Sequence, residues 1–355
     1  MISSFHNIHS QFRWNGQKHA VDSLLTLANE YLLIDNDYRQ SIGVFIKDWF
    51  DESPTITLNT SGSTGTPKAI TIAKKSMVAS AIATGDFFRL QPGMTALLCL
   101  PANYIGGKMM LVRAWLLGLE LTEINPNQDP LSASEAVFDF CAMTPHQLSN
   151  SLKNLSQIKT LLVGGAPVSE TLCKKIKAST ARVYETYGMT ETVSHIAVRL
   201  LNGQANNNFF QTLPNVILSE DSRGCLVVHA SQISTAPIVT NDLVRLHSPT
   251  SFEWLGRVDR VVNSGGIKLI PEQIERALST LFTQRFFVAG LPDPQYGQKL
   301  VLVVEGNSAE QSITSLKQES SLPTIQLPKE VFVVAKFLET PSGKINRLAV
   351  LESLC

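Results

Sequence analysis

The chain has 355 residues, of which 44% are apolar and 17% charged, so it is long enough for two domains with sizeable cores. Its 30 basic and 30 acidic side chains cancel, which gives no support for a nucleic-acid or membrane partner. The sequence has no 18-residue apolar run, no N-terminal apolar leader segment and no CxxC pair among its five cysteines, which predicts no membrane span, no zinc site and a location in the reducing cytoplasm.

The first 190 residues alternate between short apolar strands and amphipathic helices. Strands are predicted at 55–59, 69–73, 95–100, 119–124, 138–145, 159–165 and 181–188, and helices at 21–33, 74–88, 106–118, 145–155 and 168–179. Apolar strands separated by helices are typical of a parallel, doubly wound α/β sheet. Gly118 stands where a helix C-terminus needs a left-handed residue.

The pattern changes after residue 193. Strands at 195–200, 215–220, 225–230, 237–247 and 251–256 follow one another without helices, which predicts an antiparallel sheet or a distorted β-barrel. From residue 257 a hairpin, two helices and three strands form a small α+β unit. We therefore expect a large N-terminal domain over 1–256 and a small, mobile C-terminal domain over 257–355.

The stretch "SGSTGTPK" joins two predicted strands. It is not a Walker A motif, because Gly62 and Gly65 are too close together and Pro67 precedes Lys68. Glycine amides, hydroxyl groups and one ammonium can nevertheless surround a polyanion. From the residues alone, a phosphate-binding loop and a solvated Gly/Ser turn both remain open.

Polar motifs also follow the strand that ends at "YETYG". Tyr187, Gly188, Thr190 and Glu191 lie where an open α/β sheet binds its ligands, although a surface turn is an equal alternative. A tyrosine ring can cover a base, and a carboxylate can hold Mg²⁺ beside phosphates.

Further along the chain, single charges interrupt apolar strands or follow a turn. Asp242 in "VTNDLVRL" and Arg257 in "GRVDR" are such charges, and Lys344 follows a Pro-Ser-Gly turn. Each of these, taken alone, is more typical of a solvated side chain than of a site.

The order of these motifs carries more information than any one of them. "SGSTGTPK", "YGMTET", "NDLVRL", "GRVDRVVNSGGIKL" and "PSGK" resemble the core motif series of adenylate-forming acyl-CoA ligases and nonribosomal adenylation domains over residues 56–347. The resemblance implies ATP, Mg²⁺ and coenzyme A as cofactor and co-substrates, and a small-molecule carboxylic acid as substrate.

The resemblance also implies a role for each matching residue. The β- and γ-phosphates would be held by Thr60, Ser61, Gly62, Ser63, Thr64, Gly65 and Lys68. The nucleotide site would be completed by Gly164, Gly165, Ala166, Pro167, Tyr187, Gly188, Asp242 and Arg257. Thr190 would contact the α-phosphate, Glu191 would bind Mg²⁺, and Lys344 would be the catalytic lysine. Asp259 matches the hinge, and Gly265 and Gly266 match the coenzyme A face.

The sequence "YGMTETVSHIA" is similar to the o-succinylbenzoate–CoA ligases of menaquinone biosynthesis, and the phosphate loop begins early in the chain, as in short members. Tyr104, Ser194 and His195 are therefore expected in the acyl pocket. The unreacted carboxylate of such a dicarboxylate needs a cation or donors, for which Lys108, Arg113 and His195 are candidates. For Lys108 and Arg113, a solvated helix face is the slightly favoured alternative.

Alternatives stay open at this point. The enzyme could act on another aryl or acyl acid, it could load a carrier-protein thiol, or the chain could be a nucleotide-binding protein without turnover. "LPANY" and Asn263 depart from many relatives in the acyl and coenzyme A regions. The oligomeric state is also open, with a homodimer among the alternatives.

Overall fold

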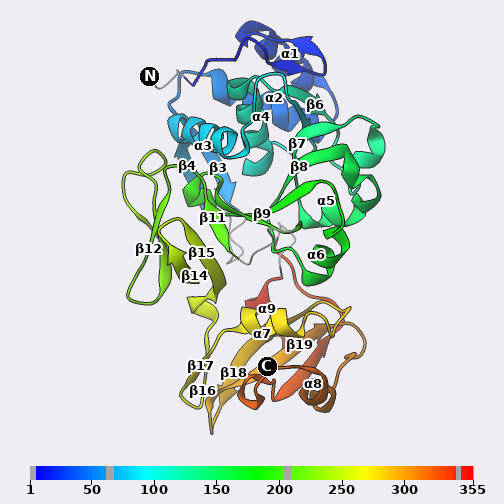
Figure 1. The fold of residues 1–355 in the computed structure, drawn as a ribbon, viewed down its shortest axis with the longest axis vertical. Coiled ribbons are helices and arrows are strands. Elements are labelled where there is room, and N and C mark those ends of the chain that lie inside the picture. The colour runs from blue at the N-terminus through cyan, green and yellow to red at the C-terminus, as the bar shows by residue number, and fades with distance from the viewer. Residues whose placement is uncertain (1–4, 61–67, 204–208, 341–344, 355) are drawn as a thin grey trace.

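The computed structural model describes residues 5–60, 68–203, 209–340 and 345–354, without the side chains of Asn59, Thr60 and Lys68. Within these ranges two large groups of strands occupy different parts of the sequence (Figure 1). Thirteen strands between residues 13 and 257 form one sheet, and five strands between 262 and 334 form another. The domain boundary at residues 256 and 257 stays a prediction. No helix in the described ranges has the length and apolar character needed to cross a membrane.

The strands of the large sheet follow the predicted change of pattern. They are β1 (Arg13–Trp14), β2 (Gln17–Lys18), β5 (Thr95–Leu98), β6 (Glu120–Glu123), β7 (Phe138–Met143), β8 (Ile158–Val163), β9 (Arg182–Gly188), β10 (His195–Leu200), β11 (Phe210–Thr212), β12 (Ile217–Glu220), β13 (Cys225–His229), β14 (Ile238–Ser248) and β15 (Ser251–Arg257). Strands β6, β5, β7, β8 and β9 pair in parallel, and β10 to β15 pair antiparallel beyond them. The predicted parallel region and the antiparallel region after residue 193 are both confirmed.

The second sheet contains β16 (Val262–Ser264), β17 (Ile267–Leu269), β18 (Phe286–Asp293), β19 (Gly297–Glu305) and β20 (Glu330–Val334). Strands β3 (Thr55–Thr60) and β4 (Lys68–Ala73) pair only with each other, so they are not part of the parallel sheet. Their register places Thr60 opposite Lys68. This pairing holds together the two ends of the expected phosphate loop.

The helices cover both groups of strands (Figure 1). They are α1 (Val21–Leu33), α2 (Asp37–Phe50), α3 (Lys74–Phe88), α4 (Ile105–Leu117), α5 (Pro145–Asn150), α6 (Glu170–Ile176), α7 (Pro271–Leu278), α8 (Ile313–Glu319) and α9 (Arg347–Glu352). Helix α4 is buried on nearly every side, as its almost continuous apolar sequence requires. It ends at Gly118 with φ +72°, and a Cβ there would lie 2.3 Å from His9 Nδ1.

Helix α2 was not predicted. Its N-cap Asn36 accepts a hydrogen bond from the Arg39 backbone N–H, and its inner face buries Phe45 and Trp49. The rings of Phe45 and Trp49 lie 5.7 and 5.9 Å from that of Trp115 on α4. Helix α2 is therefore packed onto α4, the helix that carries Arg113.

Candidate functional site

The carboxyl ends of β8 and β9 bring two of the expected nucleotide-binding segments together. The parallel register pairs Val163 with Glu185, so the segment from Gly164 lies beside the end of β9. A Cβ on Gly164 would lie 2.4 Å from Thr186 Oγ1, so a larger residue at this position would displace the Thr186 side chain. Gly165 has φ +87°, and its open surroundings leave backbone within reach of a ligand. Ala166 and Pro167 follow at the surface.

Asp242 lies at the centre of a hydrogen-bonded group beside this edge. Its Oδ2 accepts from Tyr187 Oη at 2.6 Å, and its Oδ1 accepts from Trp254 Nε1 at 3.1 Å. Arg257 NH1 lies 3.8 Å from the same Oδ1 and also binds Asp259 through NH2 at 2.7 Å. Four predicted residues from three motifs, Tyr187, Asp242, Arg257 and Asp259, are therefore connected in space.

The electrostatic effects in this group have clear causes. Burial, followed by the Asp242 charge, raises the pKa of Tyr187 far above its ordinary value, so the phenol stays protonated and acts as the donor. The hydrogen bond from Arg257 lowers the pKa of Asp259 and raises that of Arg257. Asp242 is therefore a fixed acceptor between a neutral phenol and a guanidinium.

Sequence reasoning missed Trp254, which it treated only as a strand residue. A half-buried tryptophan usually finds an acceptor for its indole N–H, and here the acceptor is the predicted ribose-binding carboxylate. If Asp242 binds the ribose, Trp254→Phe should raise the KM for ATP about fivefold, because one hydrogen bond to a charged group is lost. Initial rates at varied ATP concentration measure this effect.

The matched control is Trp14→Phe. Trp14 Nε1 donates to Glu123 Oε2, also at 3.1 Å, where α1 and α2 pack on β6. This variant should leave the KM for ATP unchanged. An equal rise in the KM for ATP in both variants would contradict a role of Trp254 in the nucleotide site.

Thr190 and Glu191 lie in a short 3₁₀ turn, Thr190–Thr192, directly after β9. The Glu191 side chain is exposed, so its carboxylate is open to a ligand. Among the described residues no cluster of three His, Cys, Asp or Glu side chains could hold a metal. A Mg²⁺ ion held by one carboxylate and by substrate phosphates needs no such cluster, so this donor set fits magnesium.

A second polar group lies between α4 and β10. The Arg113 guanidinium is buried, with NH2 3.1 Å from Ser194 Oγ and 3.4 Å from His195 Nδ1. Its Nε has no hydrogen-bond partner, and its NH1 and NH2 groups bond to Met110, Ser194 and His195 rather than to a described carboxylate. Burial lowers the pKa of Arg113 to about 9, so the group is still a cation at neutral pH. The structure thus brings three predicted acyl-pocket candidates together.

The hydrogen bonds fix the protonation state of His195. Because a guanidinium only donates, Nδ1 of His195 is the acceptor and Nε2 carries the proton. Nε2 lies 3.4 Å from Thr84 Oγ1, whose own proton goes to the Ser80 carbonyl. Burial and then the charge of Arg113 hold the pKa of His195 well below its ordinary value. His195 is therefore neutral and supports Arg113 without adding charge.

Lys108 does not belong to this group, although it lies on the same helix. Its ammonium is 4.5 Å from the centre of the Phe45 ring, in the contact between α4 and α2. Five residues along a helix turn the side chain by about 140° relative to Arg113. Tyr104 is the N-cap of α4, is largely exposed, and is not one of the residues that bond to Arg113.

The buried position of Lys108 predicts a pH-dependent stability. Burial lowers its pKa to about 8, so the folded state binds fewer protons than the unfolded state between this value and the ordinary Lys value. Stability should therefore rise with pH through that window. Lys108→Met should raise the free energy of unfolding by about 3 kcal/mol near pH 7 and by little above about pH 10.

Urea unfolding at the two pH values tests this expectation. Lys75→Met, on an exposed position of α3, is the control and should show no such pH dependence. An equal increase in the free energy of unfolding of Lys108→Met at both pH values would contradict the lowered pKa of Lys108.

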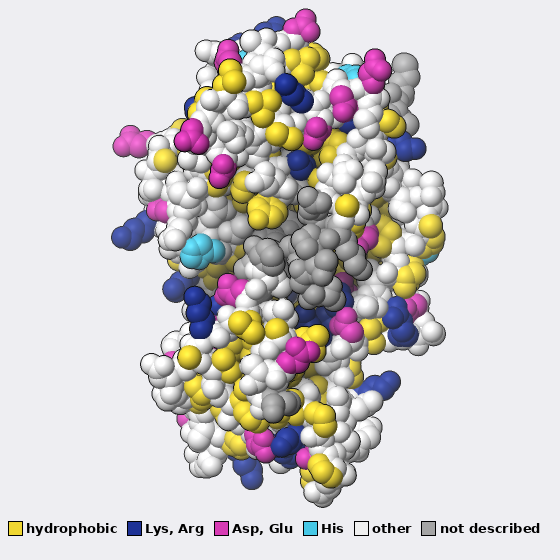
Figure 2. Space-filling view, turned by 180° about the vertical axis from the view of Figure 1, so that it is seen from behind, with side chains coloured by type: hydrophobic (Ala, Val, Ile, Leu, Met, Phe, Trp, Pro, Cys, Tyr) yellow, Lys and Arg dark blue, Asp and Glu magenta, His cyan; other side chains and the backbone are white. Residues whose placement is uncertain are grey.

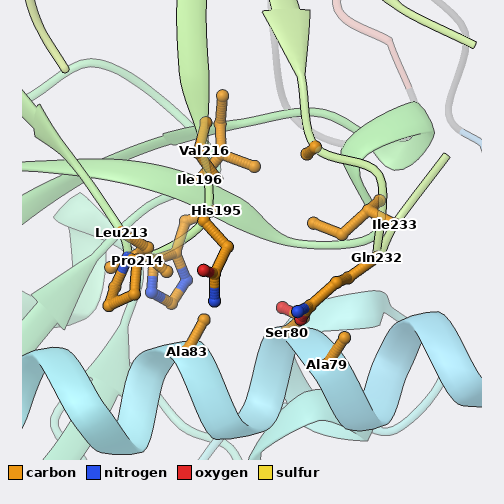
Figure 3. A pocket seen from close by; sticks show the side chains of 12 residues that line it. Ala79, Ser80, Ala83, His195, Ile196, Leu213, Pro214, Val216, Gln232 and Ile233 are labelled. Carbon is orange, nitrogen blue, oxygen red and sulfur yellow. The ribbon is translucent and has the colours of Figure 1, made fainter. Parts of the chain in front are cut away.

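Two of the cavities in the described part of the chain lie near the sheet, and neither is lined by the predicted nucleotide-binding residues. A cavity of about 10 Å³ between α3 and β10 is lined by His195, Ser80 and Gln232 (Figure 3). This is room for about one water molecule. A larger groove of about 510 Å³ lies at the start of β9, around Arg182 and Tyr184. That is the end of the strand opposite to Gly188, and the adenylation motifs do not reach it.

Several predicted residues lie outside the described residues. These are Ser61, Gly62, Ser63, Thr64, Gly65 and Lys344, together with the side chains of Thr60 and Lys68. Their roles stay predictions. Acidic and basic side chains are both spread over the face of the molecule seen in Figure 2.

The hinge and the expected coenzyme A face are described. Asp259 lies in the 3₁₀ turn Val258–Arg260 between β15 and β16. Gly265 and Gly266 have φ +57° and +80° at the tip of the β16–β17 hairpin, a turn that requires positive φ at both positions. Their roles in rotation and coenzyme A binding also stay predictions.

Residues 46–216, which include the ends of β8 and β9, match the family model described as AMP-binding enzyme. The solved acyl-CoA synthetase (AMP-forming)/AMP-acid ligase II-like protein from Dyadobacter fermentans is 37% identical, with 93% of this chain and 98% of that chain covered and a TM-score of 0.62. The chain belongs to this family of AMP-forming acyl-CoA synthetases.

Other relatives are less similar in sequence. A probable 2-succinylbenzoate–CoA ligase from Mycobacterium tuberculosis is 26% identical over 343 residues, 86% of each chain. The o-succinylbenzoate coenzyme A synthetase of Bacillus subtilis, solved with ATP and a magnesium ion, is 20% identical. The superposition covers 82% of this chain and 68% of the Bacillus subtilis chain, with a TM-score of 0.70. The two proteins therefore share a fold.

Proposed function

We propose that the chain is a cytoplasmic, ATP-dependent acid–CoA ligase of menaquinone biosynthesis that adenylates o-succinylbenzoate and transfers the acyl group to coenzyme A. The observation that carries the substrate assignment is Arg113, a buried cation without a described carboxylate partner. Relatives named 2-succinylbenzoate–CoA ligase support the same assignment.

The chemistry of the acid explains why such a cation is useful. A buried charge without an ionic partner is costly, because water solvation has been lost and no opposite charge replaces it. A substrate with two carboxylates can present one to the nucleotide and the other to Arg113. Ser194 and the neutral His195 hold the guanidinium in place and leave its charge uncompensated. A monocarboxylic acid would leave this charge unpaired.

The first half-reaction follows from the nucleotide edge. The substrate carboxylate attacks the α-phosphorus of ATP, and pyrophosphate leaves. Asp242 accepts the ribose hydroxyls, Thr190 contacts the α-phosphate, and the loop at 60–68 surrounds the β- and γ-phosphates. Because two anions meet, positive charge from Lys344 stabilises the transition state. Magnesium held by Glu191 and the phosphates would supply further neutralisation when bound.

In the second half-reaction, the coenzyme A thiolate attacks the acyl-adenylate carbonyl and AMP leaves. The small C-terminal domain would rotate about Asp259, withdraw Lys344 and bring Gly265 and Gly266 to the thiol channel. Such a rotation needs only a few residues that change φ and ψ.

A panel of aryl and acyl acids assayed for coenzyme A thioester tests the proposal. O-succinylbenzoate should be the best substrate, and free coenzyme A should accept the acyl group. Strong turnover of a plain benzoate or a fatty acid beside weak turnover of o-succinylbenzoate would overturn the substrate. Transfer to a carrier-protein thiol but not to coenzyme A would favour an adenylation enzyme of the carrier-loading type.

A further inference from the structure

Val193, between Glu191 and Ser194, has an unusual backbone conformation. It has φ +66° and ψ −55°, in a region that β-branched residues rarely adopt. These angles are those of a three-residue γ-turn, a strained form. A hydrogen bond of 2.7 Å from the Ser194 backbone N–H to the Thr192 carbonyl closes this turn. The strain is therefore an observed feature of the chain next to the acyl-pocket candidates.

Several contacts hold the strained turn in place. The Val193 side chain is 2% exposed and lies in the apolar core. Its backbone N–H donates to the Thr190 carbonyl at 2.9 Å. The buried Thr192 hydroxyl accepts from the Met189 backbone N–H at 2.9 Å and lies 2.8 Å from the Ser194 carbonyl. Strain of this kind persists only where the surroundings over-determine it.

Gly188 contributes to the same arrangement. A Cβ at this position would lie 2.4 Å from the Ser194 carbonyl oxygen and 2.6 Å from His195 Cα. The antiparallel register pairs Gly188 directly with His195. The chain therefore reverses between Gly188 and His195, through the 3₁₀ turn Thr190–Thr192 and the γ-turn at Val193.

The direction of the next two side chains depends on this turn. Ser194 Oγ and His195 Nδ1 lie 3.1 and 3.4 Å from the same Arg113 nitrogen. Successive side chains on a regular strand point to opposite faces of the sheet, so Ser194 and His195 could not both reach one nitrogen without the turn at Val193. The position of both partners of Arg113 therefore follows from the backbone of Val193.

We propose that Val193 is a positioning residue for substrate selection: its buried side chain holds the strained turn that directs Ser194 and His195 onto Arg113. This inference rests on the proposed function, in which Arg113 receives the second carboxylate of an aromatic dicarboxylate. Val193 itself does not touch the reacting atoms. It acts by keeping the guanidinium in one orientation.

The test compares Val193→Gly with the wild type on two acids. Glycine adopts the turn without strain, but it lacks the side chain that pins the turn. The KM for o-succinylbenzoate should rise about tenfold, as expected when a charge-assisted contact is misplaced. The KM for 4-phenyl-4-oxobutanoate, which lacks the ring carboxylate, and the KM for ATP should be unchanged. An unchanged ratio of the two acid KM values would overturn the proposal.

Two further variants separate positioning from general destabilisation. Val228→Ala removes methyl groups from another fully buried valine, on β13, and should leave the ratio of KM values unchanged. Val193→Thr keeps the branched shape of the side chain, so its ratio of the two acid KM values should stay close to that of the wild type. If Val193→Gly does not fold, Val193→Ala takes its place with the same expected direction.

A measurement without substrate distinguishes this proposal from the proposed function. NMR titration of the His195 ring should show no protonation near its ordinary pKa in the wild type, because the ring is buried against Arg113. In Val193→Gly the ring should leave Arg113 and titrate closer to the ordinary value. If that change occurs while the wild type rejects every dicarboxylate, the proposed function fails and the positioning role stands. An unchanged titration would refute the positioning role.

Discussion

Lys344→Ala is expected to reduce acid-dependent pyrophosphate release by about a thousandfold, the upper range for removal of one preorganised transition-state contact. The reason is electrostatic, since a carboxylate and a triphosphate must approach each other and the lysine neutralises the charge that develops. Thioester formation from preformed acyl-adenylate should be nearly unaffected, because the proposed rotation has withdrawn the lysine by that stage.

The matched control for this substitution is Lys336→Ala. Lys336 is an exposed lysine just beyond β20, in the same small unit of the chain. Both half-reactions should proceed normally in this variant. Full pyrophosphate release in Lys344→Ala would remove the catalytic role from Lys344, and an equal loss in both half-reactions would indicate a structural role.

Arg113→Met is expected to raise the KM for o-succinylbenzoate about a hundredfold, because the second carboxylate loses a buried charge partner. Methionine fills a similar volume but has no charge, so the variant no longer buries an uncompensated cation. The ligand-free variant should therefore be at least as stable as the wild type, whereas activity on the acid falls. Initial rates at varied acid, together with thermal unfolding, measure both effects.

Arg182→Met serves as the control, because Arg182 is exposed at the other end of β9. It should change neither the KM for the acid nor the KM for ATP. If Arg113→Met binds o-succinylbenzoate as the wild type does, Arg113 is not the partner of the second carboxylate. A rise in the KM for ATP alone would instead place Arg113 at the nucleotide.

Much of the fold could be predicted because local signals and burial agree. Continuous apolar strands between helices predicted the parallel region, and Gly118 marked a helix end that the structure confirms. Helix α2 was missed because its apolar positions are interrupted by charges, and its capping residue Asn36 was not recognised. The separate pairing of β3 with β4 is a tertiary outcome that strand propensity does not encode.

The candidate site was predictable in its parts but not in its connections. The motifs supplied Tyr187 and Asp242, and only the folded chain shows that the phenol donates to the carboxylate. Lys108 and Arg113 were equal candidates in sequence, and packing on different sides of α4 separates them. The conformation of Val193 has no sequence signal, because valine is an unfavourable residue for positive φ.

The central claim is that one bound acid reaches the nucleotide edge with one carboxylate and Arg113 with the other. A crystal structure with a stable analogue of the o-succinylbenzoyl-adenylate tests it most directly. The ribose should contact Asp242, and the free carboxylate should lie about 2.8 Å from a guanidinium nitrogen of Arg113. A free carboxylate found in solvent or on another cation, with Arg113 still unpaired, would contradict the claim.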